Sequence, residues 1–192
     1  MWEHDDSNRT SSVCISRDGN YAASLGSTGT LNFYYPHTLY PPVWTWTGAE
    51  TTYGGAAMAM SDDGKKIAIA GSNDLYCFGV TNNTPLWTTN GGTYDNWFNS
   101  SNNVAISGDG NYVAAFSNLT NSGGTADKII LFDGDGNFKW TWSGRSSGQP
   151  LGSLNLSQDG KYLAAGFNNA SNDNSNPQVV FWDTSSSTPL WT

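Results

Sequence analysis

Side chains that commonly carry out catalysis are scarce in this sequence. Its 192 residues include two histidines and two cysteines. His4 and His37 lie far apart, so spacing pairs no nucleophile with a base and an orienting acid. Cys14 and Cys77 lie in the apolar runs VCIS and LYCF, where we expect small buried hydrophobes rather than a disulfide. The sequence therefore predicts no catalytic residue, no cofactor and a protein that is not an enzyme.

Two acidic segments are the candidates for binding a cation. His4-Asp5-Asp6 contains ligand types, but an acidic segment of this kind is ordinarily solvated. The run DGDGN at 133–137 is similar to a calcium loop, but its turn glycine comes fourth instead of sixth. The twelfth residue of that loop is Gly144, where a calcium loop has a bidentate Glu. We expect a hairpin turn at this run and no metal site.

Composition favours a folded all-β protein. Hydrophobic residues make up 37% and aromatic residues 14% of the chain, enough to form a core, and Gly, Ser, Thr and Asn are abundant. The net charge is −8 and the pI is near 4.3, with no cluster of Lys and Arg, which argues against a nucleic-acid partner. No window approaches the roughly 18 consecutive apolar residues of a membrane helix, so we expect no membrane insertion.

The same composition bears on location. Few Lys and many Asn, Thr, Ser and Gly are typical of exported proteins, so we expect an extracellular or cell-surface site, although the N-terminal residues lack a signal peptide. The Asn-X-Ser/Thr sequons discriminate little, because this composition would produce about four or five by chance. These possible N-glycosylation sites are Asn8, Asn82, Asn99, Asn118, Asn155 and Asn169.

An internal repeat organises the chain. The motif Ser-X-Asp-Gly begins at residues 16, 61, 107 and 157, and a tryptophan recurs in phase with it. Gly takes the positive φ that a tight turn needs, and Asp at such a turn caps its own backbone, so both are interpreted as structural. The repeated turn residues are Asp18, Gly19, Asp63, Gly64, Asp109, Gly110, Asp159 and Gly160. The repeated tryptophans, interpreted as packing residues, are Trp2, Trp44, Trp87, Trp140 and Trp191.

Each repeat is predicted to form four antiparallel strands. Alternating apolar residues such as Val13 and Ile15 precede the turn, an Ala-rich run follows it, and later runs carry the aromatic residues. This gradient from small to bulky side chains suits wedge-shaped blades around an axis. We predict an all-β fold, a β-propeller with four four-stranded antiparallel blades in one domain, 1–192. The blades are expected at about 12–46, 56–89, 103–142 and 152–192, with 1–4 as an outer strand of a neighbouring blade.

Two of the repeats resemble known families. The run VVFWD, ending at Trp182-Asp183 and preceded by SQDGKYLAAG, resembles a repeat of the WD-repeat family. The run FDGDGNFKWTWSG is similar to repeats of quinoprotein-like propellers. The chain departs from typical WD repeats because it lacks their Gly-His pair, and only the fourth repeat contains Trp-Asp. The resemblance implies the propeller fold and does not carry over a quinoprotein activity, because no cofactor or calcium ligands can be placed.

Four blades are the rare extreme for a closed propeller. Trp2 and Trp191 are equivalent in the repeat, so one copy of that strand is surplus to a closed ring. We therefore expect a half or partial ring of a propeller with about seven or eight blades. An open fragment exposes apolar faces and strand edges, which predicts self-association into a closed dimeric ring or a polymeric assembly.

Long polar loops are expected on one face of the propeller, at 91–102, 118–127 and 168–177. Tyr94, Trp97 and Phe98 stand in the first of them and form a candidate partner-binding face for a protein or glycan ligand. An alternative of equal weight is that Trp97 and Phe98 fold back over the blade.

The preferred function is a non-catalytic propeller module for interaction or structure, extracellular and self-associating. One alternative is a fragment of a propeller enzyme, quinoprotein-like or glycan-active, with its catalytic residues outside this chain. Another is an excised or designed repeat fragment made to test propeller assembly.

Overall fold

The computed structural model describes residues 9–38, 42–48, 57–71, 74–89, 104–117, 128–143, 151–167 and 179–191. Within these ranges all of the regular secondary structure is β-strand, and no helix there is long and apolar enough to cross a membrane.

The first blade contains β1 (Thr10–Ile15), β2 (Ala22–Gly26), β3 (Thr30–Tyr34) and β4 (Trp44–Thr47). The second contains β5 (Ala57–Met60), β6 (Lys66–Ala70), β7 (Leu75–Gly79) and β8 (Pro85–Thr89). The third contains β9 (Val104–Ile106), β10 (Tyr112–Ser117), β11 (Lys128–Asp133) and β12 (Phe138–Trp142). The fourth contains β13 (Leu151–Leu156), β14 (Tyr162–Phe167) and β15 (Val179–Asp183).

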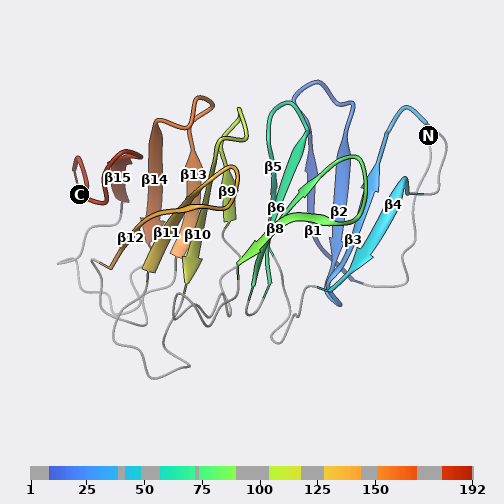
Figure 1. The fold of residues 1–192 in the computed structure, drawn as a ribbon, viewed down its shortest axis with the longest axis horizontal. Coiled ribbons are helices and arrows are strands. Elements are labelled where there is room, and N and C mark those ends of the chain that lie inside the picture. Colours follow the sequence, from blue (N-terminus) through green and yellow to red (C-terminus); the bar gives the residue numbers. More distant parts are fainter. Residues whose placement is uncertain are drawn as a thin grey trace.

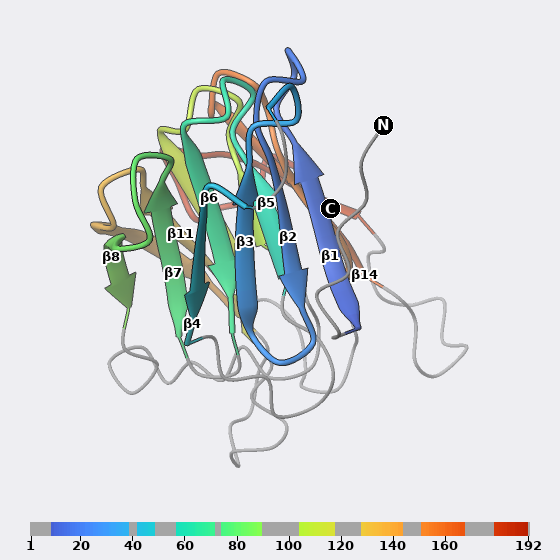
Figure 2. The same cartoon turned by 90° about the vertical axis from the view of Figure 1, so that its right-hand side faces the viewer.

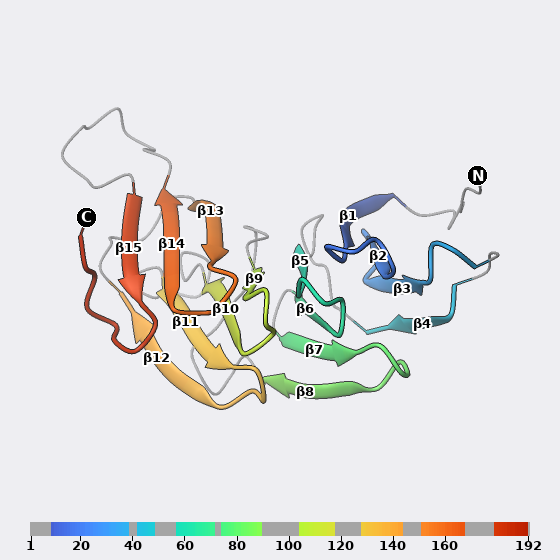
Figure 3. The same cartoon turned by 90° about the horizontal axis from the view of Figure 1, so that it is seen from above.

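The blades are antiparallel sheets that stand side by side along an arc (Figure 1). Each sheet pairs its strands in chain order, from the first to the last. Seen from above, β1, β5, β9 and β13 lie on the inside of the arc and β4, β8 and β12 on the outside (Figure 3). The inner strands contact one another in sequence, β1 with β5, β5 with β9 and β9 with β13. The arc is open, with the first blade at one end and the fourth at the other, so the prediction of a partial all-β propeller is confirmed.

The fourth blade differs from the expectation of four strands. After β15, only Trp191 forms a bridge, to Phe181. Its carbonyl accepts the N–H of Phe181 at 3.2 Å, and the N–H of Leu190 donates to the Phe181 carbonyl at 2.8 Å. In the other blades the fourth strand carries a tryptophan that is hydrogen-bonded to the following blade. No described blade follows the fourth, so this run is held by its backbone pairing and by the stacking of Trp191 on Phe181, whose ring centroids lie 5.3 Å apart.

The repeated Asp-Gly motif forms the turn between the first two strands of each blade. In the third blade the Ser107 hydroxyl donates to Asp109 at 2.6 Å, and the N–H of Tyr112 donates to the Ser107 oxygen at 3.0 Å. Gly110 has a φ of +70° and donates its N–H to the Ser107 carbonyl at 2.9 Å. The serine and aspartate are joined in the same way in the other three blades. The aspartate therefore organises its own turn in every repeat.

These hydrogen bonds also set the ionisation of the turn aspartates. In Asp18 the hydroxyl of Ser16 is the largest influence that lowers the pKa below its usual 3.8, followed by the N–H of Asn20. In Asp109 burial is the largest influence and raises the pKa, but hydrogen bonds from Ser107 and Asn111 together outweigh it. The carboxylates are therefore ionised at neutral pH and are already engaged within the turns.

The turns also join one blade to the next. The N–H of Arg17 donates to the Asp62 carbonyl, and the N–H of Asp62 donates to the Gly108 carbonyl, both at 2.9 Å. The N–H of Asp109 then donates to the Gln158 carbonyl at 2.9 Å. The turns thus form a backbone-bonded row along one edge of the arc.

At two of the junctions between blades, a tyrosine ring packs directly on the turn glycine of the following blade. A Cβ on Gly64 would collide with the ring of Tyr21 in the preceding blade. A Cβ on Gly160 would collide in the same way with the ring of Tyr112. These glycines are required for the positive φ and also for the close approach of the neighbouring blade.

The repeated tryptophans link the outer parts of neighbouring blades. The indole N–H of Trp44 donates to the Val80 carbonyl at 3.0 Å, and that of Trp140 to the Thr184 carbonyl at 2.7 Å. Trp87 makes the equivalent bond to Gly134 at 3.1 Å. Each acceptor directly follows the third strand of the next blade, so the indole bridges the two sheets at the same place.

Apolar packing between blades forms the core. The three clusters of buried residues each combine side chains from two adjacent blades. Phe33 of the first blade lies in one cluster with Phe78 of the second, and Trp140 of the third lies in another with Trp182 of the fourth. Burial of a blade face therefore depends on the presence of the next blade.

Trp140→Phe tests the indole bridge. Phenylalanine keeps an aromatic ring in the cluster but leaves the buried Thr184 carbonyl without this donor, so the free energy of unfolding should fall by about 1–3 kcal/mol. Urea unfolding followed by circular dichroism measures it. Trp191→Phe is the matched control, because Trp191 is 55% exposed and should change stability little. Equal losses in the two variants would contradict the assigned role.

Because the pKa values of the turn aspartates are lowered, we expect the free energy of unfolding to fall in acid. Their pKa values are lowered in the folded chain, so their contribution is complete above the usual value of 3.8 and is lost as pH falls through the lower folded values. The chemical-denaturation midpoint should therefore drop between about pH 4 and pH 2. The double variant Asp18→Asn, Asp159→Asn should show a shallower dependence over that range. An unchanged slope would remove the aspartates as its cause.

Candidate interaction surface: the two open blade faces

The first blade exposes an apolar face at its end of the arc, and Figure 2 looks from that end. Val13 and Ile15 of β1 are 72% and 64% exposed. Counted from the repeat turn, the equivalent residues of the third blade are Val104 and Ile106, each 8% exposed because both pack against the second blade. We name the surface formed by Val13, Ile15 and the Gly19 turn the N-face. Among the described blades, only the second packs against the first, and it does so on the other face of the sheet.

The fourth blade exposes the other side of its sheet, the side that packs on the following blade elsewhere in the arc. Tyr162 and Trp191 are 42% and 55% exposed and lie on either side of Phe181, each ring centroid 5.3 Å from that of Phe181. The equivalent stack in the first blade packs towards the second blade. Its members are Tyr21, Phe33 and Trp44. We name the surface formed by Asn155, Tyr162, Phe181 and Trp191 the C-face, and it is the side of the blade that elsewhere receives a following blade.

The outer part of the first blade is already covered on the same side as the N-face. Asn32 and Tyr34 of β3 are only 3% and 6% exposed. Ser24 and Tyr34 share a hydrogen bond of 3.1 Å between their hydroxyls, and Asn32 accepts one from Thr45 at 2.9 Å. The apolar surface open to a partner is therefore confined to the innermost strand and its turn.

Lys66 shows how a basic residue is used within the arc. It occupies the position that Tyr21, Tyr112 and Tyr162 hold in the other blades. Its ammonium donates to the carbonyls of Gly110 at 3.1 Å and Gly134 at 2.8 Å, and lies 3.9 Å from the Asp135 carboxylate. This lysine therefore joins the second blade to the third.

Several residues singled out in the sequence lie outside the described ranges. Tyr94, Trp97 and Phe98 are among them, so the long-loop binding face stays a prediction, and so does the role of Trp2. Of the sequons, those outside the described ranges are Asn8, Asn99, Asn118 and Asn169. The other two, Asn82 and Asn155, are both exposed.

Asn155 lies on the C-face, which the sequon pattern alone did not indicate. Its equivalent in the third blade is Ala105, which is 6% exposed and packs against the fourth blade. A glycan on Asn155 would therefore occupy the surface where a following blade would pack. The signal in the sequence was the single polar residue at a repeat position that is otherwise Cys14, Ala59 or Ala105.

The groups usually needed for chemistry do not gather in the described part of the chain. No three His, Cys, Asp or Glu residues there are placed to hold a metal ion. Cys14 and Cys77 are both free thiols, and burial raises the pKa of each to about 12. Cys77 is fully buried, as expected of a small hydrophobe, whereas Cys14 is only partly buried. Neither thiol is a reactive thiolate at neutral pH.

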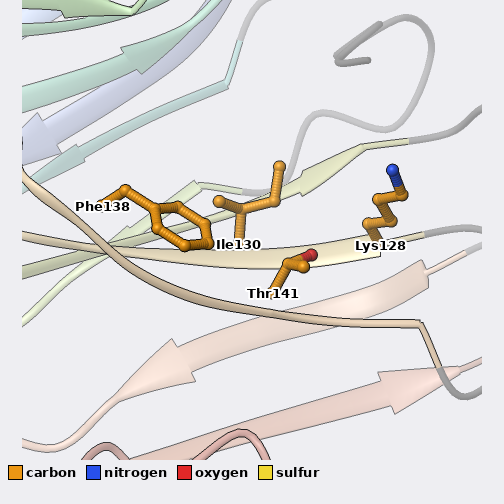
Figure 4. Close-up of a pocket in the computed structure, with 4 residues that line it drawn as sticks. All are labelled: Lys128, Ile130, Phe138 and Thr141. Atoms are coloured by element: carbon orange, nitrogen blue, oxygen red, sulfur yellow. The ribbon is translucent and has the colours of Figure 1, made fainter. Parts of the chain in front are cut away.

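A small pocket lies on the third blade, lined by Lys128 and Ile130 of β11 and Phe138 and Thr141 of β12 (Figure 4). Its volume is about 80 Å³, and its lining is mostly apolar. Pockets that hold small molecules usually measure about 300–1,000 Å³. This pocket is too small to be a ligand site of that kind.

No protein-family model matches the chain, and no curated protein matches it. A solved structure does, the β-propeller domain of Cps50 (Swd1) from Myceliophteria thermophila, with a TM-score of 0.61 and 17% identity. The match covers 84% of this chain and 51% of that domain, so the chain spans about half its length. The likeness supports the resemblance to WD-repeat propellers at the level of the fold. The chain is therefore a set of four adjacent propeller blades in an open arc.

Proposed function

We propose that this chain is a non-catalytic β-propeller module that acts by binding other macromolecules through its open blade faces, and that it self-associates. The observation that carries the proposal is the pair of exposed apolar faces at the two ends of an otherwise well-packed arc. Val13 and Ile15 mark one end, and Tyr162 and Trp191 mark the other. Apolar patches of this kind on a folded domain are typical of interaction sites.

The use made of the polar residues supports a non-catalytic role. The repeat aspartates organise turns, Lys66 joins two blades, and both thiols are protonated at neutral pH. The aspartates and Lys66 are thus engaged in holding the arc together. A binding function needs only the faces that the arc leaves open.

We further propose that the module functions outside the cell. The low Lys content and the many Asn, Ser, Thr and Gly residues support this location. Asn82 lies in an exposed turn, where its side-chain oxygen accepts the N–H of Thr84 at 2.9 Å, which leaves its amide nitrogen available for a glycan.

Sedimentation of the purified chain over a wide concentration range tests the proposal. The weight-average mass should exceed the 20.6 kDa of one chain and rise with concentration, because association buries the open faces. A folded, soluble species of 20.6 kDa at every concentration would contradict self-association. Circular dichroism of the same samples confirms that the protein is folded.

A further inference from the structure

We propose that the partner of each open face is the other open face on a second copy of this chain. The C-face of one copy packs on the N-face of the next, in the way that each blade packs on the following blade within the chain. This inference rests on the proposed self-association and specifies its geometry. Two copies joined at both ends would close a ring of about eight blades.

The turn glycines show that the two faces are complementary. Within the chain, Tyr21 and Tyr112 each cover the turn glycine of the following blade. The Gly19 turn has the same geometry, with a φ of +73°, but no atom lies within 4 Å of where its Cβ would stand. Tyr162 is the equivalent ring without a following turn and is 42% exposed. The first blade thus has a turn glycine that no ring covers, and the fourth blade has an exposed tyrosine at the position whose ring covers such a glycine elsewhere.

The row of turn-to-turn hydrogen bonds extends naturally to a second copy. Within the chain the row ends at Gln158 in the fourth blade and begins at Arg17 in the first. End-to-end packing would set the Gln158 turn beside the Arg17 turn of the second copy. In the equivalent internal junction, Arg17 pairs with Asp62 at 3.6 Å, whereas Gln158 is uncharged. No like charges would therefore oppose each other at these two turn positions.

The apolar residues of the N-face would then be covered. In the second junction, Val104 and Ile106 lie in one cluster with Ala57 and Ala68 of the preceding blade. The residue equivalent to Ala68 in the fourth blade is Ala164, which is only partly buried. Val13 and Ile15 of a second copy would lie against Ala164. The proposed contact buries two residues that are mostly exposed in the single chain.

Two features make this contact weaker than an internal junction. The outer part of the first blade, at Asn32 and Tyr34, is already covered, so the contact is limited to the inner strands. Asn155 also places an amide where the third blade has the buried Ala105. The association should therefore be reversible, and a glycan on Asn155 would prevent it.

The extent of the arc favours closure by two copies. The chain superimposes on 51% of a propeller domain, with a TM-score of 0.61. Two such arcs together provide about one complete ring. A head-to-tail contact that did not close would instead give an open polymer.

Two variants, each blocked at one face, test the geometry. The N-face variant carries Val13→Lys and Ile15→Lys, and the C-face variant carries Asn155→Arg and Tyr162→Ala. Because the contact joins unlike faces, each variant alone should sediment as a monomer of 20.6 kDa. An equimolar mixture should form a 1:1 complex of twice that mass, since one unblocked face of each kind remains. The wild type and both variants are compared at the same concentrations.

The other outcomes separate this inference from the proposed function. An N-face variant that associates alone would show contact between like C-faces, and a C-face variant that associates alone would show contact between N-faces. Either result overturns the inference and leaves self-association standing. If the wild type associates and both variants associate equally well, the inference is overturned and self-association again stands. A wild type that stays monomeric overturns both, as it would if the faces were covered by further blades of a longer polypeptide.

Single substitutions at equivalent positions give a matched comparison. Tyr162→Ala should weaken association and lower the urea midpoint of the monomer less than Tyr112→Ala does, because this ring stacks on Phe181 but covers no turn within its own chain. Tyr112→Ala should lower the midpoint, because its ring packs on the Gly160 turn. Asn155→Ala should lower the dissociation constant roughly tenfold, since it removes an amide from the contact. Equal effects of the two tyrosine substitutions on the midpoint, or weaker association of Asn155→Ala, would contradict the packing.

Discussion

The packing of one blade against the next is the interaction on which the rest of this structure depends. Each sheet has two faces, and neither is buried by the blade itself. The junctions repeat a small set of contacts, an indole bonded to the carbonyl after the third strand, a side chain over the following turn and a turn-to-turn backbone bond. The apolar clusters lie between blades for the same reason, so the stability of each repeat is shared with its neighbours.

This dependence explains how the charged residues are used. Asp18 and its equivalents hold their turns, and the turns carry the bonds that align adjacent blades. Lys66 occupies the position of a tyrosine at one junction, and its ammonium donates to two carbonyls at once, whereas a phenol has a single O–H to donate. A chain with few charged residues thus uses many of them for its architecture, and its chemistry is mainly the chemistry of contact surfaces.

The same dependence makes the ends of the arc special. Wherever the series of blades stops, one face is left that was shaped to receive a neighbour. The N-face corresponds to the side of a blade that packs on the preceding blade, and the C-face corresponds to the side that receives the following blade. Asn155 is the main departure from that relation, because a polar residue there makes the contact less favourable and offers a site at which a glycan would block it.

The sequence alone was sufficient for the blades. The turn motif, the alternation of apolar residues and the phase of the tryptophans are local patterns, and they predicted the antiparallel strands, the positive φ of the turn glycines and the open arc. The pattern was less reliable at the end of the chain, where PLWT forms a single bridge instead of a strand. In the first three blades the tryptophan of the fourth strand is hydrogen-bonded to the following blade, and local sequence does not show where such a neighbour is present.

Tertiary structure alone decided which faces are open. Val13 and Val104 are the same residue at the same repeat position, yet one is 72% exposed and the other 8%. Ile15 and Ile106 differ in the same way, at 64% and 8%. Nothing in their local sequence separates them, because burial here is conferred by the neighbouring blade. The repeat determined what each residue can pack against, and its place in the arc decided whether that neighbour is present.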